Sequence, residues 1–106
     1  MEHMDSIQIE TTFASMSDAE EMAKLLLDKH LIACGQCYEI KSLYNWEGKR
    51  HNEKEVLLKI KTQAVLYHDV EKTIKRHHPY KLPQITVTPM DGSAEYIEWV
   101  KTNTKA

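Results

Sequence analysis

Hydrophobic and polar residues first alternate near the start of the chain. Ile7 and Ile9 are separated and flanked by polar residues, the period-two pattern of a half-buried strand that we expect to run to about residue 12. Ser17 and Glu20 then fit a capping box, in which each side chain can bond the other residue's backbone N–H, so this spacing predicts a helix start. One buried helical stripe should follow at spacings of three and four, formed by Ala19, Met22, Ala23, Leu26 and His30.

The middle of the chain predicts a long hairpin. Alternate residues of 38–46 share one face of a strand, and alternate residues of 56–60 share one face of the returning strand. Residues 47–52 are polar and include Gly48, which can take a positive φ, so we expect the turn there. Each arm would have about nine residues, which is longer than the usual strand of about five or six.

The last third of the chain predicts a helix, a strand and a second helix. The first helix should run from about Gln63 to His77, because Pro79 forbids its continuation. Residues 83–89 alternate and carry a proline at each end, which is typical of a strand end or an unpaired edge. Ser93 can cap a short C-terminal helix. The residues that the first of these helices should bury are Leu66, Val70, Ile74 and His77.

The predicted order is strand, helix, strand, strand, helix, strand and a further helix. This βαββαβ order is typical of an α+β, ferredoxin-like sandwich with one antiparallel sheet, helices on one face and an extra C-terminal helix. A hairpin this long would overhang so small a domain, and overhanging strand edges pair with another chain unless they are covered. The pattern therefore hints at oligomerisation.

Length and charge narrow the class of protein. We assign residues 1–106 to a single domain with an ordered core over about residues 6–101, because 106 residues are one domain's worth. A net charge of -2 gives no general attraction to nucleic acid or anionic lipid, so no nucleic-acid partner is expected. The longest apolar run is too short to span a bilayer, and the first five residues include neither a basic segment nor an apolar segment of the kind a signal peptide has. We therefore expect a cytoplasmic protein with no membrane partner.

Four segments together resemble the CutA family of divalent-cation (copper) tolerance proteins. Residues 31–34, LIAC, resemble the family's helix-to-strand junction, and residues 44–49, YNWEGK, resemble its aromatic hairpin tip. Residues 55–62 resemble its returning strand, and residues 78–83, HPYKLP, resemble its HPY-x-x-P loop. The likeness extends from residue 7 to about residue 101, with all four motifs in consistent order and spacing.

The resemblance implies a subunit of a tight homotrimer, similar in architecture to PII signalling proteins, in which the long hairpins pair across subunits. It also implies a role in the response to metal ions and no well-established catalytic activity. Cu(II) or another divalent cation would be a weakly bound ligand, and none would be required for folding. The sequence contains no G-x-S-x-G, glycine-rich phosphate loop or H-E-x-x-H motif, so we expect no enzyme.

His77 and His78 are the first candidate metal ligands. In the copper site ascribed to some CutA relatives, two adjacent histidines match this pair, and a cysteine near the end of the first strand matches Thr11. A hydroxyl is a poor ligand for soft copper, so metal should bind weakly or through other groups. Adjacent side chains on a helix point about 100° apart and share a metal only if the backbone turns between them. The alternative, which we favour, is that His77 packs beneath the helix and His78 caps or hydrogen-bonds at the loop.

Cys34 and Cys37 form a C-x-x-C motif. Thioredoxin-type motifs lie at a helix N-terminus, where the dipole lowers the thiol pKa, whereas this one follows a helix and begins a strand. Residues three apart on a strand face opposite ways, and no second pair of zinc ligands exists at suitable spacing. We favour a buried Cys34 with an incidental Cys37 over redox or zinc chemistry.

Aromatic and charged residues of the hairpin are the second candidate site. Tyr38, Tyr44 and Trp46 share one face, which is more often interface packing than a platform for stacking a ligand. The resemblance places Glu55, Lys61, His78 and Tyr80 near clefts between subunits. There they form either a binding site for an anion or metabolite or a structural ion-pair cluster. The ligand candidates are Tyr44, Trp46, Glu55, Lys61, His78 and Tyr80.

These observations support three functional hypotheses. The first is a non-enzymatic, trimeric metal-tolerance protein that binds divalent copper weakly through surface imidazoles. The second is a PII-like signalling or binding module with a small-molecule ligand in the clefts between subunits. The third is a stable scaffold whose trimer is itself the product.

Overall fold

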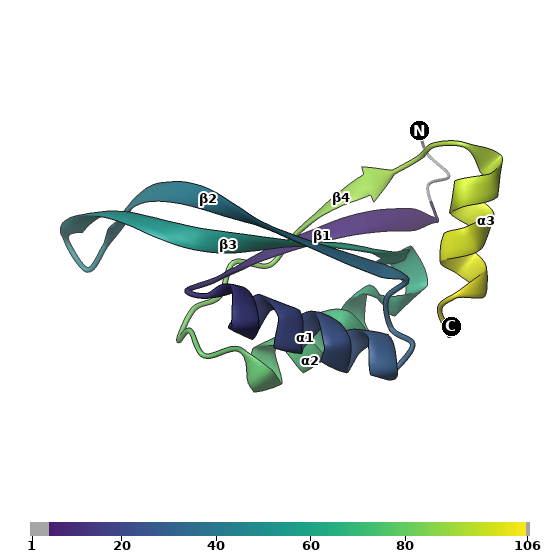
Figure 1. Cartoon of the computed structure of the whole chain (residues 1–106), viewed down its shortest axis with the longest axis horizontal. Helices are drawn as coiled ribbons and strands as arrows, with labels where there is room; N and C mark the ends of the chain where they lie inside the picture. Colours follow the sequence, from purple (N-terminus) through teal and green to yellow (C-terminus); the bar gives the residue numbers. More distant parts are fainter. Residues whose placement is uncertain (1–4, 106) are drawn as a thin grey trace.

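A computed structural model describes residues 5–105. It has an α+β fold, in which helices pack against one β-sheet (Figure 1). Four antiparallel strands form one sheet in the order β2-β3-β1-β4, and this order confirms the predicted ferredoxin-like topology. The elements are β1 (Ser6–Phe13), α1 (Met16–Asp28), β2 (Cys34–Trp46), β3 (Lys49–Gln63), a 3₁₀ turn (Ala64–Leu66), α2 (Tyr67–His77), β4 (Thr86–Met90) and α3 (Ala94–Thr102).

Helices α1 and α2 cover one face of the sheet, while α3 lies at one end of it (Figure 1). Alternate residues of the strands face α1 and α2, and this helix-covered face holds the hydrophobic core. We call the opposite sheet face the open face. Fully buried core side chains include Ile9, Leu26, Leu58, Ile60, Val70 and Ile74.

Helix α1 begins two residues earlier than the capping-box prediction. Ser15, not Ser17, is the N-cap, and its hydroxyl accepts a hydrogen bond from the backbone N–H of Asp18 at 3.2 Å. Ser15 and Ser17 lie two residues apart, and the spacing between Ser17 and Glu20 predicted the wrong one of them. The predicted stripe is buried from Ala19 to Leu26, but His30 is exposed because it lies past the helix end, at a φ of 58°.

The hairpin is longer, and its turn tighter, than the polar run predicted. Strands β2 and β3 have 13 and 15 residues and remain paired to Trp46 and Lys49, so the turn consists of Glu47 and Gly48 rather than residues 47–52. Both turn residues have positive φ, 52° and 78°, the geometry that matches the twist of the flanking strands in a two-residue hairpin. The hairpin therefore extends well beyond the helices (Figure 1).

The second half of the chain departs from prediction at two boundaries. The predicted helix from Gln63 divides into the 3₁₀ turn and α2, and strand β4 begins at Thr86 rather than Pro83. The prolines at residues 79 and 83 hold residues 78–85 in an irregular loop, which we call the HPY loop. Strand β4 is an outer strand of the sheet, as its prolines predicted, and Ser93 caps α3 through the backbone N–H of Tyr96. No helix within residues 5–105 is long and apolar enough to cross a bilayer.

Candidate functional site

A hollow of about 570 Å³ lies on the open face, between the hairpin and the HPY loop. Strand β3 extends past the end of β1, which pairs with it as far as Phe13 and Val56, so this edge of β3 has no neighbouring strand in the described chain there. The HPY loop forms the other wall of the hollow. We call this space the hairpin hollow. Its lining includes three aromatic side chains, two carboxylates and an ammonium group: Tyr44, Trp46, Tyr80, Glu53, Glu55 and Lys81.

Each carboxylate of the hairpin hollow is paired with a tyrosine hydroxyl. Tyr44 donates a hydrogen bond to Glu53 Oε1, and Tyr80 donates one to Glu55 Oε2 at 2.8 Å. The hydrogen bond to Glu53, with a smaller contribution from burial, raises the pKa of Tyr44 to about 12. Burial and then the bond to Glu55 raise the pKa of Tyr80. Both phenols therefore stay protonated at neutral pH and act as hydrogen-bond donors.

His78 is buried behind the hollow and has both ring nitrogens engaged. Its Nδ1 accepts a hydrogen bond from the backbone N–H of Tyr80 at 3.0 Å, so Nε2 carries the proton that is donated to the Thr12 carbonyl at 2.8 Å. The ring stacks on Phe13 with centroids 4.3 Å apart. Burial lowers the pKa of His78, although the Thr12 carbonyl and nearby carboxylates oppose this. His78 thus joins β1 to the HPY loop as a neutral imidazole.

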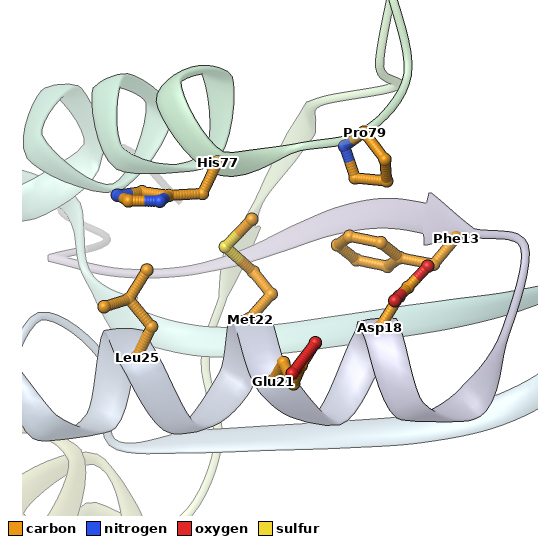
Figure 2. A pocket seen from close by; sticks show the side chains of 7 residues that line it. All are labelled: Phe13, Asp18, Glu21, Met22, Leu25, His77 and Pro79. Carbon is orange, nitrogen blue, oxygen red and sulfur yellow. The ribbon is translucent and has the colours of Figure 1, made fainter.

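His77 lies on the other side of the molecule, in a pocket of about 280 Å³ between α1 and α2 (Figure 2). It is exposed, so the interpretation that it packs beneath the helix is wrong: the buried histidine is His78. Figure 2 shows its ring extending toward Leu25, while Asp18 lies beside Phe13 at the other end of the pocket. We call this space the helix pocket.

Thr11 faces the core rather than either pocket. Its side chain is fully buried, and its hydroxyl oxygen has no hydrogen-bond partner within residues 5–105. It lies on β1 opposite Leu58, on the helix-covered face. A buried hydroxyl without a partner destabilises the fold, and its position does not make it a metal ligand.

The donor set that the family resemblance implies for copper does not fit this chain. His78 has no unused nitrogen, position 11 carries a hydroxyl, and His77 points away into the helix pocket. Among residues 5–105 no three side chains of the His, Cys, Asp and Glu types come together as a metal site. Metal binding through His77 and His78 stays a prediction, and the geometry leaves only His77 available for it.

Lys61 lies apart from the other hollow candidates within one subunit. Glu55 and Lys61 are six residues apart on β3, or about 20 Å at the usual rise of a strand. The Lys61 ammonium instead lies 5.3 Å from the ring centroid of Tyr96 and donates to its hydroxyl at 3.4 Å. The structure thus brings together Tyr44, Trp46, Glu55 and Tyr80, with His78 behind them, and leaves Lys61 at the α3 end.

The two cysteines are on opposite faces of the sheet. In β2, Cys34 pairs with Lys61 on the open face, whereas Cys37 pairs with Leu58 on the helix-covered face. Both are partly buried free thiols, and Cys37 is the one that packs against the core, so the prediction of a buried Cys34 with an incidental Cys37 is wrong. Burial, with the Glu20 carboxylate, raises the pKa of Cys37, which makes a reactive thiolate unfavourable.

Sequence reasoning missed Glu53 as a partner in the hollow. The signal was available in the hairpin register, because Tyr44 pairs with His51 and the next open-face position on β3 is Glu53. The predicted turn over residues 47–52 hid this register, since it would place Glu53 opposite Trp46, whereas Glu53 pairs with Ser42. The His51 ring also stacks on Tyr44, with centroids 5.1 Å apart.

Comparison with known proteins gives one consistent family. A family model described as CutA1 divalent ion tolerance protein matches residues 7–103. The divalent-cation tolerance protein CutA of Pyrococcus horikoshii is 37% identical over 100 residues, which cover 93% of this chain and 98% of that protein. The crystal structure of CutA1 from the same organism has a TM-score of 0.90 at 36% identity, over 94% of this chain and 99% of that chain. The structure of the CutA protein from Archaeoglobus fulgidus, described as periplasmic, has a TM-score of 0.91 at 33% identity, over the same shares.

Proposed function

This chain belongs to the CutA1 family of divalent-ion tolerance proteins, and from that premise we propose that it acts in the response to divalent cations as a non-enzymatic homotrimer with ligand-binding pockets. The family membership carries the proposal. A non-enzymatic role agrees with a site whose phenols and imidazole are held as neutral hydrogen-bonding groups. We propose that copper binds weakly, because only His77 is available among the three positions (11, 77 and 78) that the resemblance implies as ligands.

The open face and the hairpin support assembly with further copies of the chain. Tyr38, Tyr44 and Trp46 are 44%, 38% and 38% exposed on this face, a large aromatic surface for a small monomer. Strands β2 and β4 are the outer strands of the sheet and have edges without a partner among residues 5–105. Aromatic side chains are enriched in buried interfaces, so these features fit a homotrimer built around the hairpins.

Cu(II) binding is expected to depend on His77. We expect His77→Ala to weaken the first Cu(II) equivalent by about tenfold, the equivalent of about 1.4 kcal/mol, because the exposed imidazole is the available nitrogen of the pair. Equilibrium dialysis at neutral pH measures this affinity. All variants should carry His3→Ala, because His3 lies outside the described residues and could bind copper independently.

The matched control is His68→Ala, which removes another exposed imidazole from the same helix at a site away from the helix pocket. It should leave the affinity of the first equivalent unchanged. Equal Cu(II) affinities of the His77 and His68 variants would show that His77 is not a copper ligand. Neither histidine of the pair at 77 and 78 would then support a role in cation binding.

The second candidate function is binding of a small molecule in the hairpin hollow, in a PII-like manner. One observation favours it: Glu55 is 9% exposed, yet it lines a hollow large enough for a small organic ligand. The family resemblance places Glu55 and Tyr80 of this hollow near a cleft between subunits. A cytoplasmic location also stays a prediction, since a relative from Archaeoglobus fulgidus is described as periplasmic.

A further inference from the structure

The carboxylates of the hairpin hollow have no cationic partner within the described chain. Among residues 5–105 the one ion pair within 4.0 Å joins Lys75 to Glu71, which lie on α2. Glu53 and Glu55 each accept a single side-chain hydrogen bond, from Tyr44 and Tyr80. A carboxylate has room for about four hydrogen bonds on its two oxygens, so each retains unused acceptor capacity.

The lack of a cationic partner is most costly at Glu55, because its side chain is buried. A buried charge is costly unless it is paired, and a tyrosine hydroxyl supplies a hydrogen bond but no opposite charge. Lys81 also lines the hollow, but its ammonium does not come within 4.0 Å of either carboxylate. The hollow is therefore one positive charge short of balancing its two carboxylates.

Three aromatic side chains in the lining indicate the kind of cation. Trp46, Tyr44 and Tyr80 line the same hollow as the carboxylates, and the faces of such rings attract organic ammonium groups. A divalent cation held tightly by protein groups would instead need several carboxylate, imidazole or thiolate donors together, and among residues 5–105 no three such side chains form a group. The hollow's volume of about 570 Å³ is in the range of small-molecule sites.

We propose that the hairpin hollow binds a small organic cation, an alkylammonium group held by Glu53 and Glu55 and packed against Trp46, Tyr44 and Tyr80. This inference rests on the second candidate function, because it names the ligand class for the same hollow. The Tyr44 and Tyr80 hydroxyls hold the carboxylates in place, and His78 holds Tyr80 through its backbone N–H. The ammonium donates to the unused carboxylate oxygens, and its alkyl chain contacts the rings.

Fluorescence of Trp46 can report binding directly. The chain has two tryptophans, so Trp99→Phe leaves Trp46 as the single emitter. Into this full-length variant we would titrate n-butylammonium, with n-butanol as the uncharged probe, butyrate as the anionic probe and potassium chloride at equal ionic strength. We expect a saturable change in Trp46 emission with n-butylammonium alone.

Glu55→Gln should weaken n-butylammonium binding by at least about tenfold, because the amide keeps an acceptor for the Tyr80 hydroxyl but removes the charge. Glu39→Gln is the matched control: it removes one carboxylate from the same hairpin, on the helix-covered face. Its affinity should equal that of the parent. Circular dichroism of both variants checks that the fold is unchanged.

The outcomes separate the ligand class from the function on which it rests. Saturable binding of butyrate or n-butanol, but not n-butylammonium, would overturn the organic-cation inference and keep the hollow as a small-molecule site. No saturable response to any probe would overturn both, as expected if a neighbouring subunit supplies the cation. Equal weakening by Glu39→Gln and Glu55→Gln would show a general charge effect and would also contradict the proposal. The copper titrations of the His77 variants are independent of all three results.

Discussion

Replacing His78 by alanine should lower the free energy of unfolding by about 3–4 kcal/mol. The substitution leaves a cavity beside Phe13 and removes the donor to the Thr12 carbonyl and the acceptor for the Tyr80 N–H. Urea unfolding at neutral pH, monitored by circular dichroism, measures the change. His77→Ala is the matched control, because the neighbouring exposed imidazole should change the unfolding free energy by no more than about 0.5 kcal/mol.

The same residue gives the stability a pH dependence. Burial lowers the pKa of His78 in the folded state below its ordinary value of 6.5, so the unfolded chain binds more protons between those two pKa values. The stabilisation by the neutral ring is therefore complete above pH 6.5 and is lost as the pH falls from 6.5 through the folded pKa. This loss should be smaller in His78→Ala than in the parent or in His77→Ala. Equal stability of the two alanine variants at neutral pH would contradict the assigned network.

Replacing Thr11 by valine should raise the free energy of unfolding by about 1–2 kcal/mol. The two side chains have nearly the same shape, and the Thr11 hydroxyl is fully buried without a hydrogen-bond partner in the described chain, so the substitution removes a desolvated polar atom at little packing cost. Thermal and urea unfolding measure the gain. The result would also show that position 11 acts in packing.

Thr62 provides a matched control for this prediction. It is also fully buried and on the helix-covered face, but its hydroxyl donates to the Leu31 carbonyl at 2.6 Å. Thr62→Val should therefore lower the free energy of unfolding by about 1–2 kcal/mol. If Thr11→Val instead lowered the free energy of unfolding, as Thr62→Val should, the Thr11 hydroxyl would have a partner in the working protein, such as a bound water.

Much of the fold could be predicted from hydrophobic periodicity, because burial of one face imposes a period on each element. The core positions at Ile9, Leu26, Leu58 and Ile74 all follow from it. The ends of the helices and strands were predicted less accurately, because they depend on local interactions such as helix capping. Ser15 and Ser17 are both competent caps, and residues 49–52 are polar although they pair as strand. A polar run at the end of an exposed hairpin resembles a loop in sequence because neither face of the strand is buried.

The candidate site could be predicted only in part. The aromatic hairpin tip and the HPY loop were identified by family resemblance, and the structure brings them together across the hairpin hollow. Of the two histidine roles, hydrogen bonding by His78 at the loop is confirmed, but the packing of His77 beneath the helix is wrong. Which of two adjacent side chains is buried depends on the backbone after α2. His78 has a ψ of 134°, so the chain leaves the helix there and turns that ring toward β1. Lys61 was grouped with Glu55 by resemblance, while their separation along β3 places them far apart in one subunit.

The proposed homotrimer is tested most directly by light scattering on the purified protein during size-exclusion chromatography. The exposed aromatic open face and the overhanging hairpin predict an oligomer, and the family resemblance implies that it is a trimer. We therefore expect a mass of three times the 12.4 kDa of one chain, unchanged on dilution across the accessible concentration range. A single species near 12.4 kDa would contradict the homotrimer and leave Tyr38 and the edges of β2 and β4 without the partner proposed for them.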